Sequence, residues 1–377
     1  MQLIEESGSI NGFVYYVQHK RSFVKSPRSA LMLSYIIGVV IFVESSITSL
    51  VAGAVGKPLC DRYKIPHAKL AFVCDSTSAP VSSLIALNGW GALLLGLILT
   101  QIDEGILQGN AIDILLDSLL YNFYAMSALV VTFVSVWFNI NIGSMKNATL
   151  LDVPTQERVD QGRSMYFMIV PIVMMVLLVF VFLYITGDGN ILKGSGSSTV
   201  FYTMLVTWLF TLLYYLPAKV LSFSQWLRAS YIGAKKLLSV VLILLFAFAI
   251  GKITLELHTG LYLASLASEN LSVSLLSGVI FLLSSIMAFA TGTSWGTFSI
   301  MIPVAVPMAV GMDANVALAI GAVISGGVFG DHCSPISDTT IISSIASDCE
   351  VIEHVKTQLP YALISGVIAL LLFLIFS

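Results

Sequence analysis

Long apolar runs, interrupted by short groups of polar residues, make up most of the chain. The uninterrupted runs are about 20 residues long, which is the length that a helix needs to cross the hydrocarbon core of a bilayer. They do not alternate between apolar and polar residues, as the strands of a membrane barrel would. The pattern therefore predicts membrane-spanning helices at 118–142, 165–187, 200–222, 236–257 and 357–377.

Two other apolar segments have a polar group at their centre and are predicted to be re-entrant hairpins. The first, 30–56, has its tip at ESSIT (44–48). A hairpin keeps the basic clusters on either side of this segment on one side of the membrane, as the positive-inside rule requires. The second, 271–311, has its tip at TGTSWGT (291–297).

Two more apolar segments, 65–100 and 313–346, are predicted to be broken helices. Their polar centres are DSTSAP (75–80) and GDHCSPISDTT (330–340). Such groups cost a few kcal/mol each at the bilayer centre, so they mark a functional site. Proline and glycine disrupt a helix, and four of these residues predict the break in the second segment. They are Gly326, Gly327, Gly330 and Pro335.

The positions of lysine and arginine place segment 1–29 and loop 143–164 on the cytoplasmic side. The two hairpin and broken-helix pairs then enter the membrane from opposite sides. This is the inverted repeat of a secondary transporter, whose sites lie near the midplane. The first, partial repeat is predicted at 30–142 and the second at 165–377. The first repeat lacks about three helices that precede the hairpin in the second, so it is predicted to be truncated at its N-terminus.

Composition supports a membrane protein and narrows its chemistry. The chain is 57% hydrophobic and 10% charged, with a mean hydropathy of +0.93, which excludes a soluble globular protein. Basic residues do not cluster among aromatic ones, so nucleic acid is not an expected partner. The four cysteines form no paired motif, and we expect no disulfide, no cysteine metal site and no cofactor. The N-terminus does not resemble a signal peptide.

Three stretches resemble the NhaC family of Na+/H+ antiporters, of the ion transporter superfamily. They are KLAFVCDSTSAP (69–80), ATGTSWGTFSIMIPVAVPMA (290–309) and FGDHCSPISDTTIISS (329–344). The resemblance implies Na+ coupling, an inverted-repeat fold and a bacterial inner membrane. The resemblance also implies that six residues belong to the ion site: Asp75, Thr293, Ser294, Asp331, Ser334 and Asp338. The chain departs from relatives that have paired aspartates at the first hairpin tip, since it has Val43, Glu44, Ser45 and Ser46 there.

A sodium site needs about five or six hard oxygen ligands, and broken helices supply carbonyl and hydroxyl oxygens. The candidate ion- or substrate-binding residues are Asp331, Asp75, Asp338, Glu44, Ser45, Ser46, Thr48, Ser76, Ser78, Thr293, Ser294 and Ser334. Within this set Asp75, Asp331, Thr293 and Ser334 are the hypothesised Na+ ligands. A buried carboxylate can exchange a proton for Na+, so Asp331 with Asp338 or Asp75 is the predicted titrating core.

Structural alternatives stand beside these assignments. Asp331 and Glu44 are also suited to cap helices, and hydroxyl groups also bond neighbouring helices. His332 is either a proton carrier or a hydrogen-bond partner of an aspartate. Asn88 and Trp90, after the first break, are weaker candidates for the site.

The predicted function is Na+/H+ antiport by alternating access, not an enzymatic reaction. The alternative is Na+-coupled transport of an amino acid or small carboxylate. An intramembrane aspartyl protease with a GxGD motif would need glycine at Val328. The expected partners are the lipid bilayer, Na+ and H+. The sequence leaves open whether a small organic solute is also a partner and whether the protein forms a homodimer.

Overall fold

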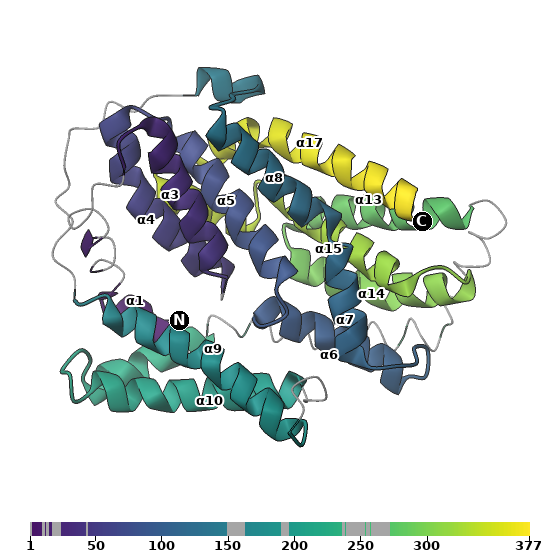
Figure 1. Ribbon diagram of the computed structural model, residues 1–377, viewed down its shortest axis with the longest axis horizontal. Coiled ribbons are helices and arrows are strands. Elements are labelled where there is room, and N and C mark those ends of the chain that lie inside the picture. Colours follow the sequence, from purple (N-terminus) through teal and green to yellow (C-terminus); the bar gives the residue numbers. More distant parts are fainter. Residues whose placement is uncertain are drawn as a thin grey trace. The chain divides into compact units, whose positions relative to one another are not determined.

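The computed structural model describes residues 2–9, 12, 15–16, 24–42, 44–148, 163–189, 196–235, 238, 253, 257 and 272–377. Within these ranges the regular secondary structure is helix, with no strand (Figure 1). The predicted span at 236–257 lies outside the described residues, apart from three single positions.

Six helical spans in the described part of the chain are long and apolar enough to cross a membrane. They are Ala111–Trp137, Tyr166–Thr186, Val273–Thr291, Ser294–Gly311, Val316–Cys333 and Val351–Phe376. A seventh is obtained when α5 (His67–Leu84) and α6 (Gly89–Asp103), bent by 40°, are counted as one span. Large apolar side chains also stand exposed on these helices, as lipid contact requires: Ile375 is 72% exposed. The chain is an all-α polytopic membrane protein, as the sequence predicts.

The chain divides into two compact units. The first combines Met1–Phe23 with Thr155–Ile243, and the second combines Val24–Pro154 with Leu244–Ser377. Of the three boundaries, one falls after 23, inside the predicted segment 1–29, and one falls after 154, inside the predicted loop 143–164. The third falls after 243, so the helices of the predicted second repeat are shared between the two units.

The first unit contains α1 (Gln2–Glu6), α9 (Tyr166–Thr186) and α10 (Gly196–Tyr215), and α9 packs along α10. Tyr215 OH donates to the carbonyl of Phe167 over 2.6 Å and joins the two helices. The predicted span at 165–187 matches α9. The predicted span at 200–222 ends early, because Pro217 lies in the turn that follows α10.

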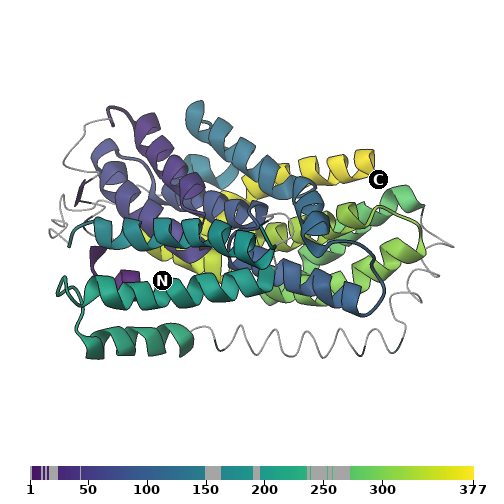
Figure 2. The same ribbon diagram turned by 60° about the horizontal axis from the view of Figure 1, so that its bottom comes forward.

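The first unit also has a helical segment at 223–235, whereas all four segments with polar centres lie in the second unit. Its helices are α3 (Pro27–Val40), α4 (Ser45–Tyr63), α5, α6, α7 (Ala111–Leu120), α8 (Phe123–Trp137), η1 (Gly143–Asn147), α13 (Val273–Thr291), α14 (Ser294–Gly311), α15 (Val316–Cys333), α16 (Asp338–Ser347) and α17 (Val351–Phe376). Figures 1 and 2 show α3 beside α4, and α17 beside α8.

Two helix pairs occupy the segments predicted to be hairpins. In the pair α3 and α4, α3 ends at Val40 and α4 begins at Ser45, where Glu44 caps α4 by accepting hydrogen bonds from two backbone N–H groups (2.8 and 3.1 Å). The pair α13 and α14 turns at Gly292, whose φ of +66° suits glycine. Since α13 and α14 are each long enough to cross a membrane alone, a re-entrant path stays a prediction.

The first helix break was predicted at the wrong place. α5 continues through DSTSAP, with Pro80 inside it, and ends at Leu84. A proline removes one N–H group, and hydroxyl groups in a membrane helix compensate for such losses. The break lies at 85–88 because the side chain of Asn88 forms hydrogen bonds with the backbone of both helix ends there. Its side chain donates to the carbonyl of Ser82 (2.8 Å) and accepts from two N–H groups at the start of α6 (2.9 and 3.1 Å).

The second break lies within the predicted motif, but the three glycines before it do not cause it. α15 is continuous through Gly326, Gly327 and Gly330, and the chain leaves the helix at Ser334. Gly326 and Gly330 instead allow α13 to approach closely. A Cβ atom on Gly326 would lie 2.4 Å from the carbonyl oxygen of Phe281, and one on Gly330 would lie 2.2 Å from that of Ser285. Small residues four apart are typical of tight helix packing in membranes.

Gly326→Leu is therefore expected to destabilise the protein. The added side chain would collide with the backbone of α13, and overpacking of this kind costs about 1–3 kcal/mol or more. The midpoint of thermal unfolding in detergent measures the effect. Gly96→Leu is the matched control, because a Cβ atom on this helical glycine meets nothing within 4 Å. Equal unfolding midpoints for the two variants would contradict the packing explanation.

Two other spans begin earlier than predicted. α7 and α8 together form the span 111–137 in place of 118–142, so Asp113 and Asp117 lie on the exposed face of a helix. The span ends where Asn139 adopts a left-handed conformation (φ +52°). α17 begins at Val351, six residues before the predicted start of the last span.

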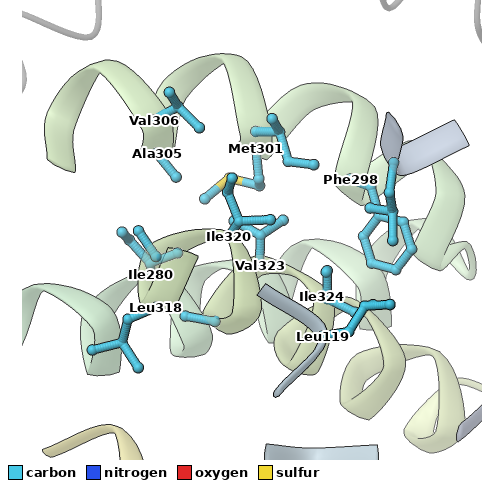
Figure 3. Packing of buried hydrophobic residues seen from close by; sticks show 14 of the residues in the cluster. Leu119, Ile280, Phe298, Met301, Ala305, Val306, Leu318, Ile320, Val323 and Ile324 are labelled. Atoms are coloured by element: carbon cyan, nitrogen blue, oxygen red, sulfur yellow. The ribbon is translucent and has the colours of Figure 1, made fainter. Parts of the chain in front are cut away.

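The apolar core of the second unit is built around α15. Figure 3 shows Leu318, Ile320, Val323 and Ile324 of this helix packed among side chains of α7, α13 and α14. α15 is buried along most of its length. It thus carries Asp331, close to its C-terminus, into the interior.

The junction between α16 and α17 is tied to α4 and α5 by polar contacts. Lys57 Nζ lies 2.8 Å from Asp348 Oδ2, and its hydrogen bond lowers the pKa of that carboxyl group. His67 Nδ1 lies 3.1 Å from the backbone carbonyl of Asp348, and its Nε2 lies 2.7 Å from Asp61 Oδ1. These contacts hold the polar faces of α16 and α17 against α5.

Candidate functional site

Buried polar side chains gather where α5, α15, α16 and α17 meet. α5 contacts α16 and α17, and α15 contacts all three. Asp75 on α5 and Asp331 on α15 are both 0% exposed. Carboxylates inside a membrane protein are costly and mark a functional site by default. The structure thus brings two of the sequence-predicted aspartates into one region.

Both oxygens of Asp75 accept hydrogen bonds. His354 Nε2 lies 3.2 Å from Oδ2, and Gln358 Nε2 donates to the same oxygen over 2.7 Å. Thr340 Oγ1 reaches Oδ2 at 3.5 Å, and Ser343 Oγ reaches Oδ1 at 3.4 Å. His354 and Gln358 are four residues apart on α17, so they share one face of the helix. Asp75 is therefore held by donors from two other helices.

Asp331 has fewer partners. Its Oδ2 accepts a hydrogen bond from Thr339 Oγ1 over 2.8 Å, and Ser337 Oγ lies 3.0 Å from the same hydroxyl group. Its Oδ1 is buried and has no hydrogen-bond partner among the described residues. An oxygen in this position is able to accept a bond from a ligand or to contact a cation without displacing a protein donor.

His332 is held as a hydrogen-bond partner on both sides of its ring. Nε2 lies 3.0 Å from the backbone carbonyl of Asp75, which only accepts, so Nε2 carries the proton. Nδ1 lies 3.0 Å from Tyr124 OH and accepts from it. The neutral ring is fully paired in this tautomer, which favours the structural interpretation of His332 over a role in carrying protons.

Tyr124→Phe is expected to lower the stability of the protein. The change removes the donor to His332 Nδ1 and leaves a buried acceptor unpaired, at a cost of about 1–3 kcal/mol. Thermal unfolding in detergent measures the loss. Tyr166→Phe serves as control, because Tyr166 is 58% exposed. An unchanged midpoint in the Tyr124 variant would mean that this bond does not hold the ring.

The predicted site residues at the two hairpin tips mainly cap the helices that begin there. Glu44 caps α4, and Thr48 Oγ1 donates to its carbonyl over 2.8 Å. Thr293 caps α14 through a backbone N–H group 3.3 Å away. Ser45 and Ser294 are buried, and Ser46 is partly buried. No hydrogen bond among the described residues joins any of these side chains to Asp75 or Asp331.

The predicted site residues of the DSTSAP and GDHCSPISDTT segments lie closer to the carboxylates. Ser78 Oγ donates to the backbone carbonyl of Asp75 over 3.2 Å, and Ser76 is buried beside it in the chain. Ser334 Oγ donates to the carbonyl of Phe289 over 2.9 Å and ties the second break to α13. Asp338 is exposed at the first turn of α16. Asn88 belongs to the first break, and Trp90 follows it in α6, where it packs edge-on against two aromatic rings of α14.

Sequence reasoning missed the two residues of α17 that hold Asp75. His354 and Gln358 lie in EHVKTQLP, where charged neighbours suggested the flank of a helix and not its interior. Their spacing of four residues was the available signal, because it places both on one helical face. Thr340 closes the GDHCSPISDTT motif, but it was not assigned to the site.

Comparison with known proteins places the chain in a family. A family model described as "Na+/H+ antiporter family" matches residues 87–377. The chain belongs to this family. The match covers more than half of the chain, including the second break and the whole of α17. It confirms the NhaC-type resemblance carried by the motifs at 290–309 and 329–344.

Relatives agree with this assignment to different extents. An uncharacterised protein of Haemophilus influenzae is 35% identical over an alignment of 384 positions, which covers 96% of this chain and 73% of the relative. An uncharacterised Na+/H+ antiporter of the same organism is 36% identical over 122 residues, 31% of this chain and 25% of the relative. A malate-2H+/Na+-lactate antiporter of Bacillus subtilis is 38% identical over 102 residues, which cover 27% of this chain and 21% of the relative.

The family and the helices together establish the general activity. The chain is a secondary antiporter and a multi-pass membrane protein, and its family consists of transporters and not of enzymes. The description of the family names Na+ and H+ as the exchanged ions.

Proposed function

We propose that this chain exchanges Na+ for H+ by alternating access, in a bacterial inner membrane and without a cofactor. The observation that carries the proposal is the pair of fully buried carboxylates, Asp75 and Asp331, of which Asp331 keeps one oxygen without a protein partner. A carboxylate in a membrane interior is stabilised by a proton or by a cation, so it is suited to exchange one for the other.

The two carboxylates have different surroundings, and we assign them different parts. Asp331 supplies the charge that binds the cation, since its free Oδ1 is open to a ligand. Asp75 is already surrounded by four donors and adds negative charge to the region. The carbonyl groups at the C-terminus of α15 point the negative end of the helix dipole toward the same region, which also favours a cation.

The charge of the site disfavours the alternative of a small carboxylate as substrate. A carboxylate is bound by cationic or N–H-rich groups. Among the lysines and arginines of the described part of the chain, Lys69 is the buried one. Its Nζ is engaged by Ser135, by the carbonyl of Ile140 (2.9 Å) and by Tyr361 OH (3.4 Å). An acidic site without a free buried cation suits Na+ better.

Purified protein in liposomes with a pH-sensitive dye inside tests the proposal. Addition of Na+ is expected to drive protons across the membrane, whereas choline is not. Protein-free liposomes control for leak. Uptake of labelled malate, lactate or an amino acid, driven by a Na+ gradient without proton movement, would overturn Na+/H+ exchange and favour the alternative.

A further inference from the structure

Gln358 joins the two carboxylate regions through one nitrogen atom. It is 0% exposed, and its Nε2 donates to Asp75 Oδ2 over 2.7 Å and to the backbone carbonyl of His332 over 2.8 Å. That carbonyl belongs to the residue after Asp331, in the last turn of α15, where carbonyl groups have no partner within the helix. Gln358 therefore lies between the side chain of Asp75 and the backbone next to Asp331.

The orientation of the Gln358 amide is fixed by its partners. A carboxylate oxygen and a backbone carbonyl only accept hydrogen bonds, and both need the NH₂ side of the amide. Turning the amide over would place Oε1 against two acceptors. Both amide hydrogens are thus used, and Oε1 faces away from these two partners.

The carbonyl oxygen of Gln358 is left without a partner. Oε1 is buried and accepts no hydrogen bond from any described residue, and the same holds for Asp331 Oδ1. Both atoms are hard oxygen acceptors, and amide carbonyl groups together with carboxylates are common ligands of hard cations. An unpartnered buried oxygen alone is not a site, since Gln101 Oε1 on α6 is similar. Gln358 differs because it is bonded to one carboxylate and to the backbone beside the other.

We propose that Gln358 Oε1 is a ligand of the transported cation and that it determines selectivity among cations. In this arrangement Asp331 supplies charge, and the Gln358 amide supplies a neutral oxygen whose position is fixed by Asp75 and by the end of α15. Asp75 thus acts on the cation site through Gln358. The inference rests on the proposed Na+/H+ exchange and adds to it a residue outside the motifs at 69–80, 290–309 and 329–344.

Two substitutions separate a ligand from a simple hydrogen-bond donor. Gln358→Met removes both the acceptor and the donors at similar size. Gln358→Glu keeps oxygen acceptors at the same position but loses the NH₂ group. If Gln358 is a ligand, the Glu variant is expected to bind Na+ better than the Met variant. If it only holds Asp75 in place, the two variants are impaired alike.

The measurement is the Na+ concentration that gives half-maximal proton flux in liposomes, with Li+ and K+ as competing ions. Gln358→Met is expected to raise this concentration about tenfold, as loss of one bond to a charged group would, with a smaller effect on the maximal rate. The preference for Na+ over K+ is expected to fall. Gln101→Met, another buried glutamine, is the control and is expected to behave as wild type.

Stabilisation by Na+ gives a second measurement that does not depend on transport. A ligand that binds only the folded protein raises the unfolding midpoint, and the rise grows with the ratio of ligand concentration to Kd. NaCl should therefore stabilise the wild type relative to choline chloride, and should stabilise Gln358→Met less. Wild-type half-saturation and selectivity in Gln358→Met would overturn this inference alone. A wild-type protein whose proton flux ignores Na+ would overturn the proposed function together with it.

Discussion

Asp331→Asn is expected to abolish Na+-dependent proton movement while the protein still folds. Asp331 is completely buried, and its protein hydrogen bond comes from Thr339 Oγ1 to Oδ2. The carbonyl oxygen of asparagine can accept that bond, so little stability is lost. The negative charge is lost, however, and breaking a buried charge pair costs about 3–5 kcal/mol, which corresponds to a fall in exchange rate of about 100-fold or more.

Proton flux at saturating Na+ measures the effect, and the elution profile and unfolding midpoint in detergent report on folding. Asp313→Asn is the matched control. Asp313 is exposed between α14 and α15 with φ +53°, a conformation that asparagine adopts readily. Wild-type flux in the Asp331 variant would show that another group binds the cation.

The apolar pattern was sufficient to predict helices, but not where the polar helices break. Long apolar runs determine an all-α membrane fold because every backbone group must be paired inside the bilayer. Within a polar segment, proline and glycine were misleading guides: α5 passes through Pro80, and α15 passes through Gly326 and Gly330. The breaks depend on capping contacts such as those of Asn88, and on close contact between helices, which a single sequence does not display.

The candidate site was predicted to the extent that polar residues interrupt apolar ones. This signal found Asp75 and Asp331, because each is surrounded in sequence by residues of a membrane helix. It could not find their partners, since His354 is 279 residues from Asp75 and lies near charged residues at a helix end. It also could not tell a cap from a ligand, as Glu44 illustrates, because a helix start offers N–H groups to the same oxygens that would bind a cation.

Substitution of Asp75 is expected to show a second large effect, which differs between alanine and asparagine. Asp75→Ala removes the acceptor for His354, Gln358, Thr340 and Ser343, all of which are buried. Loss of a buried charged partner costs about 3–5 kcal/mol of stability, so this variant is expected to unfold at a clearly lower temperature. Because the Gln358 amide loses its anchor, Na+-dependent flux should be lost as well.

Asp75→Asn separates the hydrogen bonds from the charge. Its carbonyl oxygen can replace Oδ2 as acceptor for Gln358, while its NH₂ group can donate to Ser343 Oγ, so most of the stability is expected to remain. Unfolding midpoints and proton flux are compared for both variants, with Asp117→Ala on the exposed face of α7 as control. A midpoint in Asp75→Ala equal to that of wild type would contradict the anchoring role. Full exchange in Asp75→Asn would show that Asp75 acts only as an acceptor that positions Gln358, and would leave the charge of the cation site to Asp331.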